Sequence, residues 1–316
     1  MFVGTAHGLI YKATPPSTVC TNALCSWNET TIYEFTSGTD AFGVTAFDSA
    51  GNLYGIGSGG AYGQGAVFEL TPLSGGWTEQ ILYSFTGGAD GGGPNSLLLG
   101  QDGNLYGTAA GGGNNGCYYG VSCGVVFQLV PSGSGWTENV IYAFTGAYTD
   151  GWDPSGLIQD SQGNLYGVDV CFGFLYGGCY PYEYFRLDGV IFGLSRSGGG
   201  WEFGQIHTYE TSECPLDSRG DNVNAGVTYH ALTLDPGGIL YATEGGGTIY
   251  FCGQNCYIEV SCGGIWSRRS GTVVSGAADI FGNITSDANG NLYGTTSTCG
   301  FGTLQRTDGM IWQYSP

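Results

Sequence analysis

The chain has 316 residues, of which 10% are charged, and its 26 acidic against 7 basic residues give a formal net charge of −19. This charge excludes nucleic acid and anionic membranes as partners held electrostatically, because both are polyanions. No apolar run is long enough to insert into a bilayer. Aromatic residues make up 14% of the chain, enough to form a core, so the 61 glycines do not indicate a disordered protein.

A tyrosine motif recurs along the whole chain. It reads MFVGT from Met1, NLYGI from Asn52, NLYGT from Asn104, NLYGV from Asn164, ILYAT from Ile239 and NLYGT from Asn291. Self-similarity at such spacing is typical of repeat architectures. We therefore predict one domain over residues 1–316, made of repeats 1–51, 52–103, 104–163, 164–238, 239–290 and a partial repeat 291–316.

Each full repeat contains four segments of strand length. In the repeat that begins at Asn104 they are NLYGT, GVVFQL, WTENVIYAF and GLIQD. They are rich in β-branched and aromatic residues, are bounded by Gly, Pro or Asp, and show no helical period. The pattern predicts an all-β fold, a β-propeller of about six (five to six) four-stranded blades. A solenoid is the second choice, because its repeats are usually shorter.

We name the four strand positions of a blade A (GLIQD), B (NLYGT), C (GVVFQL) and D (WTENVIYAF). The chain begins at a B position and ends at a C position, so the first and last blades are predicted to be incomplete.

Four turns between positions A and B place an aspartate three residues before a glycine. The aspartates are Asp48, Asp160, Asp235 and Asp287. Such an aspartate accepts hydrogen bonds from the backbone of a type I turn, and the glycine takes the positive φ that follows. We therefore predict turns here rather than calcium loops. The tyrosine after Asn-Leu and the tryptophan that opens position D are predicted to pack between neighbouring blades.

The connections fall on two faces of the predicted propeller. The A–B and C–D turns are short, whereas the B–C and D–A connections are long and differ between repeats. We call the face formed by the B–C and D–A connections the variable face. Binding residues concentrate on loops held by a rigid scaffold, so the variable face is the predicted site.

Eleven cysteines occur, and none has the CxxC spacing expected of zinc or redox sites. Disulfides formed in an oxidising compartment are the prediction, with an extracellular or cell-surface location and no cofactor. The odd count leaves one free thiol or one bond between chains. Crosslinks such as Cys117–Cys123 and Cys171–Cys179 would stabilise the loops. The predicted disulfide residues are Cys20, Cys25, Cys117, Cys123, Cys171, Cys179, Cys214, Cys252, Cys256 and Cys262.

The same loops are rich in tyrosine. Exposed tyrosines beside glycines are typical of recognition surfaces, where the ring contacts a sugar or a protein. The alternative is that these rings pack on one another and cap the propeller mouth. The candidate binding residues are Tyr118, Tyr119, Tyr176, Tyr180, Tyr182, Tyr184, Tyr250 and Tyr257.

An enzyme is the alternative function. His7 and His230 both map to the variable face, and a histidine with an arginine and a carboxylate could abstract a proton from, or hydrolyse, an acidic polysaccharide. The further candidates are Arg219, Arg306, Asp153 and Glu244. No nucleophile elbow, paired-carboxylate motif or HExxH motif accompanies them. His207 takes the place of a D-strand tyrosine and is predicted to be structural.

Three aspartates recur at one position of the D–A connections, namely Asp40, Asp90 and Asp150. Carboxylates at such positions could bind calcium. Recurrence within a repeat is also what a turn requires, and the turn is the favoured interpretation.

The segments GNLYGTAAGGG, GVVFQLVPSGSGWTENVIYAFTG and GLIQDSQG together resemble the GloVer repeat, a tandem repeat of bacterial surface proteins. The resemblance covers most of the chain and is strongest over residues 52–163. It implies an exported, propeller-like protein and brings no catalytic residues. We expect a secreted or cell-surface protein that binds a glycan, another protein or copies of itself.

Overall fold

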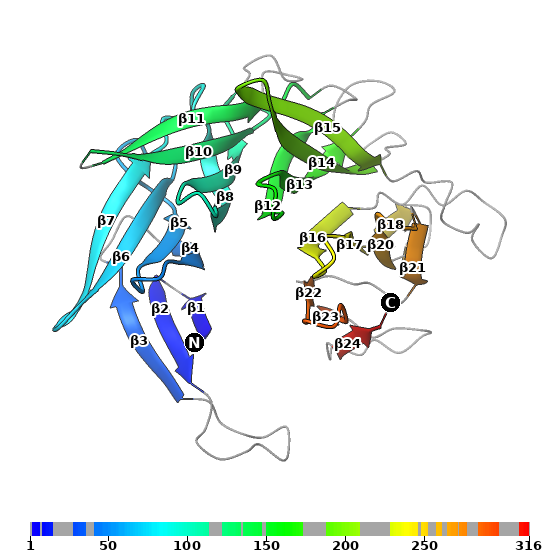
Figure 1. Cartoon of the computed structure of the whole chain (residues 1–316), viewed down its shortest axis with the longest axis horizontal. Coiled ribbons are helices and arrows are strands. Elements are labelled where there is room, and N and C mark those ends of the chain that lie inside the picture. Colours follow the sequence, from blue (N-terminus) through cyan, green and yellow to red (C-terminus); the bar gives the residue numbers. More distant parts are fainter. Residues whose placement is uncertain are drawn as a thin grey trace. The chain divides into compact units, whose positions relative to one another are not determined.

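A computed structural model describes residues 2–6, 8–14, 28–35, 41–113, 122–133, 135–146, 150–172, 188–208, 228–245, 248–251, 257–260, 264–270, 272–276, 284–296 and 310–315. Over these residues the chain consists of antiparallel strands and turns, without a helix (Figure 1). Hence no described helix could span a membrane.

The chain divides into two compact units. The first unit comprises Met1–Gly113 and Gly124–Ala143, and the second comprises Asn114–Cys123 and Phe144–Pro316. Each unit is described by itself below. The prediction of one domain over residues 1–316 stays a prediction.

The first unit contains three sheets in which strands adjacent in sequence pair antiparallel. The first sheet has three strands and the other two have four. They are β1 (Phe2–Ala6), β2 (Leu9–Thr14) and β3 (Asn28–Glu34); β4 (Ala41–Phe47), β5 (Leu53–Gly57), β6 (Ala66–Leu73) and β7 (Gly76–Ser84); and β8 (Gly92–Leu99), β9 (Leu105–Gly111), β10 (Val125–Ser132) and β11 (Gly135–Ala143).

The second unit repeats this pattern and adds one hairpin. Its sheets are β12 (Trp152–Gln159), β13 (Leu165–Phe172), β14 (Asp188–Ser197) and β15 (Gly200–Thr208); β16 (Thr228–Leu234), β17 (Leu240–Gly245), β20 (Gly264–Ser267) and β21 (Thr272–Gly276); and β22 (Ile284–Ser286), β23 (Leu292–Thr296) and β24 (Met310–Tyr314). The hairpin consists of β18 (Thr248–Phe251) and β19 (Tyr257–Val260).

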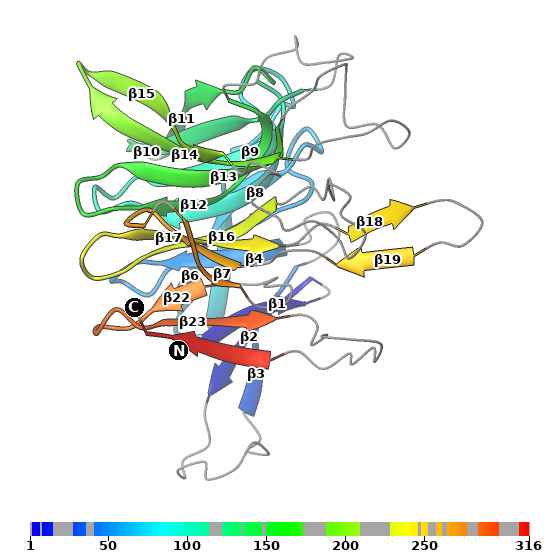
Figure 2. The same cartoon turned by 90° about the vertical axis from the view of Figure 1, so that its right-hand side faces the viewer.

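The predicted β-propeller blade is confirmed, with strands in the order A, B, C, D. In the described part of the chain four sheets are complete blades, one sheet has only positions B, C and D, and one has only A, B and C. The sequence interpretation was wrong in one respect: the B–C connection that follows β17 is not only a loop, because it contains the β18–β19 hairpin. This hairpin extends beyond the strands of its own blade (Figure 2).

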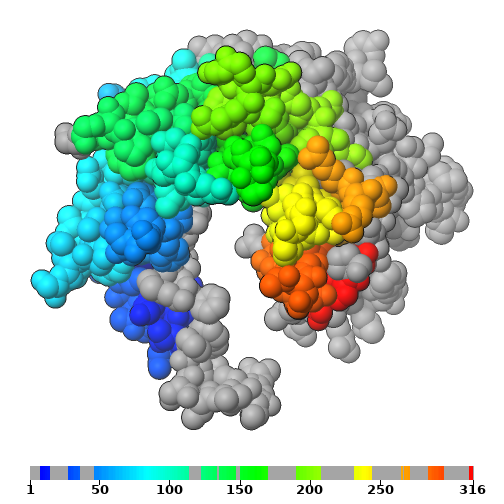
Figure 3. Space-filling view, in the orientation of Figure 1, coloured from blue at the N-terminus to red at the C-terminus, as the bar shows by residue number. Residues whose placement is uncertain are grey.

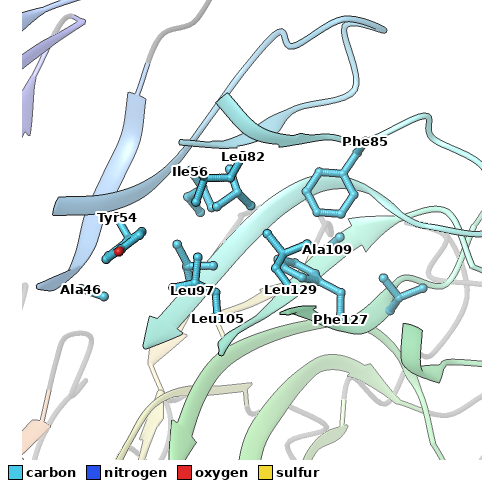
Figure 4. Close-up of a cluster of buried hydrophobic side chains, with 12 residues drawn as sticks. Ala46, Tyr54, Ile56, Leu82, Phe85, Leu97, Leu105, Ala109, Phe127 and Leu129 are labelled. Carbon is cyan, nitrogen blue, oxygen red and sulfur yellow. The ribbon is translucent and has the colours of Figure 1, made fainter. Parts of the chain in front are cut away.

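The hydrophobic cores lie between neighbouring sheets rather than within one. In the first unit one cluster joins β1–β3 to β4–β7, and a second joins β4–β7 to β8–β11. The second cluster contains Leu82 and Phe85 on one side and Leu105 and Leu129 on the other (Figure 4). These sheets lie in direct contact (Figure 3). The second unit has equivalent clusters around Leu240 and Leu292.

In the part of the chain that the structure describes, three phenylalanines at the ends of D strands each contact a phenylalanine on a C strand. The ring centroids of Phe35 and Phe68 are 5.0 Å apart, and those of Phe85 and Phe127 are also 5.0 Å apart. Within the second unit the pair Phe144 and Phe192 lies at 5.3 Å. All three pairs have the edge-to-face geometry that aromatic quadrupoles favour.

The glycine of the tyrosine motif makes room for the C-strand phenylalanine. Gly107 on β9 pairs with Phe127 on β10, and Gly167 on β13 pairs with Phe192 on β14. A Cβ atom added at either glycine would collide with the ring of its partner. The motif therefore needs glycine because the aromatic ring lies across the backbone at this point.

Every C–D pair among the five described carries a β-bulge at the same place. In the third sheet Val126 pairs with Tyr142 and Phe127 with Val140, so Ile141 is the extra residue. Because of this extra residue, the alternation of side chains between the two faces of the sheet shifts by one position along the D strand. As a result Val140, and Ile81 at the same position of β7, are exposed.

Replacing Gly107 by alanine is expected to lower the free energy of unfolding by about 1–3 kcal/mol, because the methyl group would displace the Phe127 ring. The control is Gly204→Ala on β15, where an added Cβ would meet no atom within 4 Å. That variant should change stability by less than about 0.5 kcal/mol. Urea unfolding of both variants is the measurement, and equal losses would contradict the steric explanation.

Candidate functional site

The A–B turns use the residues of the tyrosine motif to bind a carboxylate. Asp48 Oδ1 accepts hydrogen bonds from the backbone N–H groups of Ala50 and Asn52, both at 2.9 Å. Asp48 Oδ2 accepts from Asn52 Nδ2 at 2.8 Å and from the hydroxyl of Tyr54 at 3.2 Å. Burial would raise the pKa of Asp48, but these hydrogen bonds outweigh burial and lower it.

The same set of bonds recurs around Asp160 and Asp287. Asp235 begins an equivalent turn, in which Gly238 N–H donates to the Asp235 carbonyl at 2.9 Å. The prediction of turns is confirmed. In the third sheet Gly100 takes the first turn position instead, and Asp102 inside the turn accepts from Asn104 and from Tyr106, whose hydroxyl lies 2.7 Å away.

The predicted packing of the motif tyrosine and the D-strand tryptophan between blades is confirmed for one pair in the first unit. The rings of Tyr54 on β5 and Trp136 on β11 meet edge-to-face with centroids 6.3 Å apart. The polar groups of the A–B turns thus form hydrogen bonds with one another, so these turns belong to the scaffold of the fold.

On the variable face of the first unit, backbone hydrogen bonds hold the connections together. The β5–β6 loop closes on itself through Gly65 N–H to the Gly59 carbonyl at 2.9 Å. Gly93 N–H at the start of the next blade donates to the Gln64 carbonyl at 2.7 Å, and Gly113 N–H donates to the Gly88 carbonyl at 2.9 Å. These hydrogen bonds therefore hold the described connections, and the side chains on them, in defined positions.

Tyr62 at the tip of the β5–β6 loop is 62% exposed. The N–H of the preceding Ala61 donates to Ser84 Oγ at 3.1 Å, which ties the loop to the end of β7. The sequence analysis missed Tyr62, because it considered only tyrosines near the cysteine-rich loops. The signal was present in GGAYGQG, where an aromatic residue stands among glycines in a B–C connection.

Two of the three calcium candidates have described side chains, and both bind threonine. Asp90 accepts from Thr86 N–H at 2.8 Å, from the Thr86 hydroxyl and from the Tyr83 hydroxyl at 3.0 Å. Asp150 accepts from the N–H and the hydroxyl of Thr145, both at 2.8 Å. These are the contacts of a turn. Asp40 lies outside the described side chains, and within the described part no three His, Cys, Asp or Glu residues are placed to hold a metal ion.

Glu138 on β11 lies close to this group. Its Oε1 atom is buried and has no hydrogen-bond partner among the described residues. Burial and the negative charge of Asp90 raise the pKa of Glu138 to about 7. Neither Glu138 nor its environment was singled out from the sequence.

The structure describes little of the catalytic alternative. His230 lies on β16 at a bulge between Tyr229 and Ala231, and Glu244 on β17 pairs with Tyr229, but their side chains are outside the described set. Tyr250 and Tyr257 lie on the β18–β19 hairpin, with backbone alone described. The candidates wholly outside the described residues are His7, Arg219, Arg306, Tyr118, Tyr119, Tyr176, Tyr180, Tyr182 and Tyr184. His207 is paired with Ile191, in the register of the D-strand tyrosines.

Asp153 is the one catalytic candidate whose side chain is described. It is the second residue of β12, has φ of 55° and is the single non-glycine residue with positive φ in the described part of the chain. Its N–H donates to the Cys123 carbonyl at 3.0 Å, and burial raises the pKa of its carboxyl. The equivalent residue one repeat earlier is Gly93, with φ of 61°, so the fold requires the left-handed conformation here.

Cys123 is buried and disulfide-bonded. The side chains of the other nine predicted disulfide cysteines lie outside the described set, so the predicted Cys117–Cys123 and Cys171–Cys179 pairs stay predictions.

Comparison with known proteins gives a family. Residues 3–179, more than half of the chain, match the Gloeobacter/Verrucomicrobia repeat. No curated protein matches the sequence.

Solved structures give only distant likenesses. A polysaccharide lyase, an ulvan lyase, is 11% identical with a TM-score of 0.47, and the match covers 82% of this chain and 66% of the lyase. The leech intramolecular trans-sialidase is 12% identical with a TM-score of 0.45, covering 82% of this chain and 36% of that protein. The inulosucrase from Halalkalicoccus jeotgali is 14% identical with a TM-score of 0.40, covering 82% and 75%. The chain thus spans less than two thirds of the first two proteins, and at these values no activity transfers to it.

Replacing Asp153 by glycine is expected to raise the free energy of unfolding by about 0.5–1 kcal/mol, because glycine adopts positive φ without steric strain. The reverse change, Gly93→Asp, introduces that strain and should lower stability by about 1 kcal/mol. Thermal unfolding of both variants is the measurement. A loss of stability in Asp153→Gly would show that the carboxyl makes a contact worth more than the strain.

Proposed function

Since the chain belongs to the Gloeobacter/Verrucomicrobia repeat family, we propose that this β-propeller protein acts outside the cell as a binding protein for neutral carbohydrate. The site we assign lies on the variable face of the first unit, where the β5–β6 loop and the connection from β7 to β8 meet.

The exposed ring of Tyr62 is the observation that carries this proposal. A tyrosine offers a large, rigid contact surface at a low entropy cost, and a ring on a hydrogen-bonded loop is already oriented for binding. The β7–β8 connection carries Thr86 and Asp90, whose hydroxyl and carboxylate oxygens are of the kind that hydrogen-bond sugar hydroxyls and are bonded to each other here. A flat apolar ring beside such groups suits a sugar, which has both C–H faces and hydroxyl edges.

The charge of the protein argues for a neutral glycan. At a net charge of −19 the surface repels chains that carry sulfate or uronate groups. No described Lys, Arg or His lies among the residues that shift the pKa of Asp90 or Glu138 in this region, so no local positive charge offsets the repulsion.

The location outside the cell is supported by the cysteines. Disulfides persist in oxidising compartments and are rare in the cytosol. Cys123 is disulfide-bonded, and the chain carries ten further cysteines.

Binding to an array of neutral and acidic glycans tests the proposal. Replacing Tyr62 by alanine should weaken binding of the best neutral glycan about tenfold or more, because the ring supplies the main contact. The control is Leu73→Ala, which removes a side chain that is 60% exposed at a C–D turn and should leave affinity unchanged.

Three results would contradict the proposal. If the Tyr62→Ala variant bound the neutral glycan as tightly as the natural protein, the assigned site would be wrong. If the protein preferred acidic glycans, the assigned class of ligand would be wrong. Cleavage of a bound glycan, lost on replacing His7 and His230, would favour the enzyme alternative.

A further inference from the structure

We call the contact between two neighbouring sheets a seam. At two successive seams of the first unit, a tyrosine of one D strand lies near a glutamate of the next D strand. At the seam between β3 and β7 the hydroxyl of Tyr33 donates to Glu79 Oε2 at 2.9 Å. Glu79 and Glu138 occupy the same position of the segments WTEQILY and WTENVIY. The equivalent bond at the seam between β7 and β11 would run from Tyr83 to Glu138.

The second seam is different. The hydroxyl of Tyr83 donates to Asp90 Oδ2 at 3.0 Å. Glu138 Oε1 is left buried, without a hydrogen-bond partner among the residues that the structure describes. Burial and the bond to Asp90 raise the pKa of Tyr83, so its hydroxyl keeps its one proton and serves a single carboxylate.

The described groups that interact with Glu138 are Tyr83 and Asp90, and the carboxylate of Asp90 disfavours a charge on Glu138. Tyr83 lies on β7, and Asp90 lies in the β7–β8 connection. Tyr62 of the β5–β6 loop lies near Tyr83. An ionised Glu138 would leave a buried oxygen without a donor beside a second carboxylate, whereas the protonated acid removes that repulsion and gains a donor of its own.

We propose that Glu138 is a proton-binding group of the β7–β11 seam, which tightens the seam when it is protonated and loosens it when it ionises. This role does not depend on the ligand of the variable face.

Ionisation of Glu138 is expected to affect the β7–β8 connection and the β5–β6 loop. An ionised Glu138 competes with Asp90 for the hydroxyl of Tyr83. Asp90 also holds the β7–β8 connection through Thr86, and Gly93 at its end binds the Gln64 carbonyl of the loop that carries Tyr62. Hydrogen bonds thus join Tyr83 of the seam to Asp90 and Thr86 of the β7–β8 connection, and join Gly93 of β8 to the loop that carries Tyr62.

The direction of the pH effect follows from the raised pKa. The ordinary value for Glu138 is 4.5 and the folded value is about 7, so between these values the folded protein keeps a proton that the unfolded chain has lost. The stabilisation is complete below the unfolded pKa and is lost as the pH rises through the folded pKa. The pKa values of Asp48, Asp90 and Asp160 are lowered, so the stabilisation of the fold by these carboxylates is lost as the pH falls.

Urea unfolding at pH 5 and pH 8 tests the proposal. The unfolding equilibrium constant of the natural protein is expected to rise at least about tenfold more between these pH values than that of Glu138→Gln, allowing for partial exposure of the group. The matched control is Glu79→Gln, which should keep the full pH dependence because Glu79 is already bonded to Tyr33.

A direct titration covers the case in which the variant folds poorly. Carbon-13 carboxyl resonances of the natural protein should include one glutamate with a midpoint near 7, absent from Glu138→Gln. A Glu138 midpoint close to 4.5 would overturn the proposal, as would equal pH dependence of the natural protein and Glu138→Gln.

Discussion

The structure depends on one constraint: a blade of four short strands cannot bury its own faces and must pack against the next blade. The contact that meets this constraint is the edge-to-face pair of phenylalanines, with centroids 5.0 Å apart in two seams of the first unit and 5.3 Å apart in one pair of the second unit. The C-strand ring of each pair needs space below it, and in two blades the motif glycine provides that space. The tyrosine motif is therefore a packing device, and its glycine is required by a neighbouring ring rather than by a ligand.

The hydrogen bonds of the A–B turns have a consequence for function. Asn and Tyr of the motif both donate to the turn aspartate, so the most recurrent polar residues of the chain are occupied within the scaffold. Residues that differ between repeats are free to act elsewhere. In the described part of the first unit one such residue is Tyr62, which is exposed on the variable face.

Much of the fold followed from the sequence because it is encoded locally. Strand positions, their order and the turn aspartates each depend on a few adjacent residues. The D-strand bulge did not follow, because WTENVIYAF alternates acceptably without it and only pairing with β10 shows the extra residue. The hairpin of β18 and β19 was missed because its strands have four residues each and stand among glycines and cysteines. For the proposed site, the sequence prediction named the variable face and tyrosines of its cysteine-rich loops, and it did not include Tyr62.

Glu79 and Glu138 mark the limit of what the sequence alone determined. By itself it established the repeat, the blade, the turn aspartates and the face on which loops vary, because these depend on local pattern and periodicity. Neither glutamate was assigned a role from the sequence, in which the two occupy the same place in nearly identical segments. Only the tertiary structure separated them: Glu79 receives the hydroxyl of Tyr33, whereas the hydroxyl of Tyr83 is taken by Asp90 from another loop. A hydroxyl has one proton to donate, and which carboxylate receives it depends on groups distant in sequence.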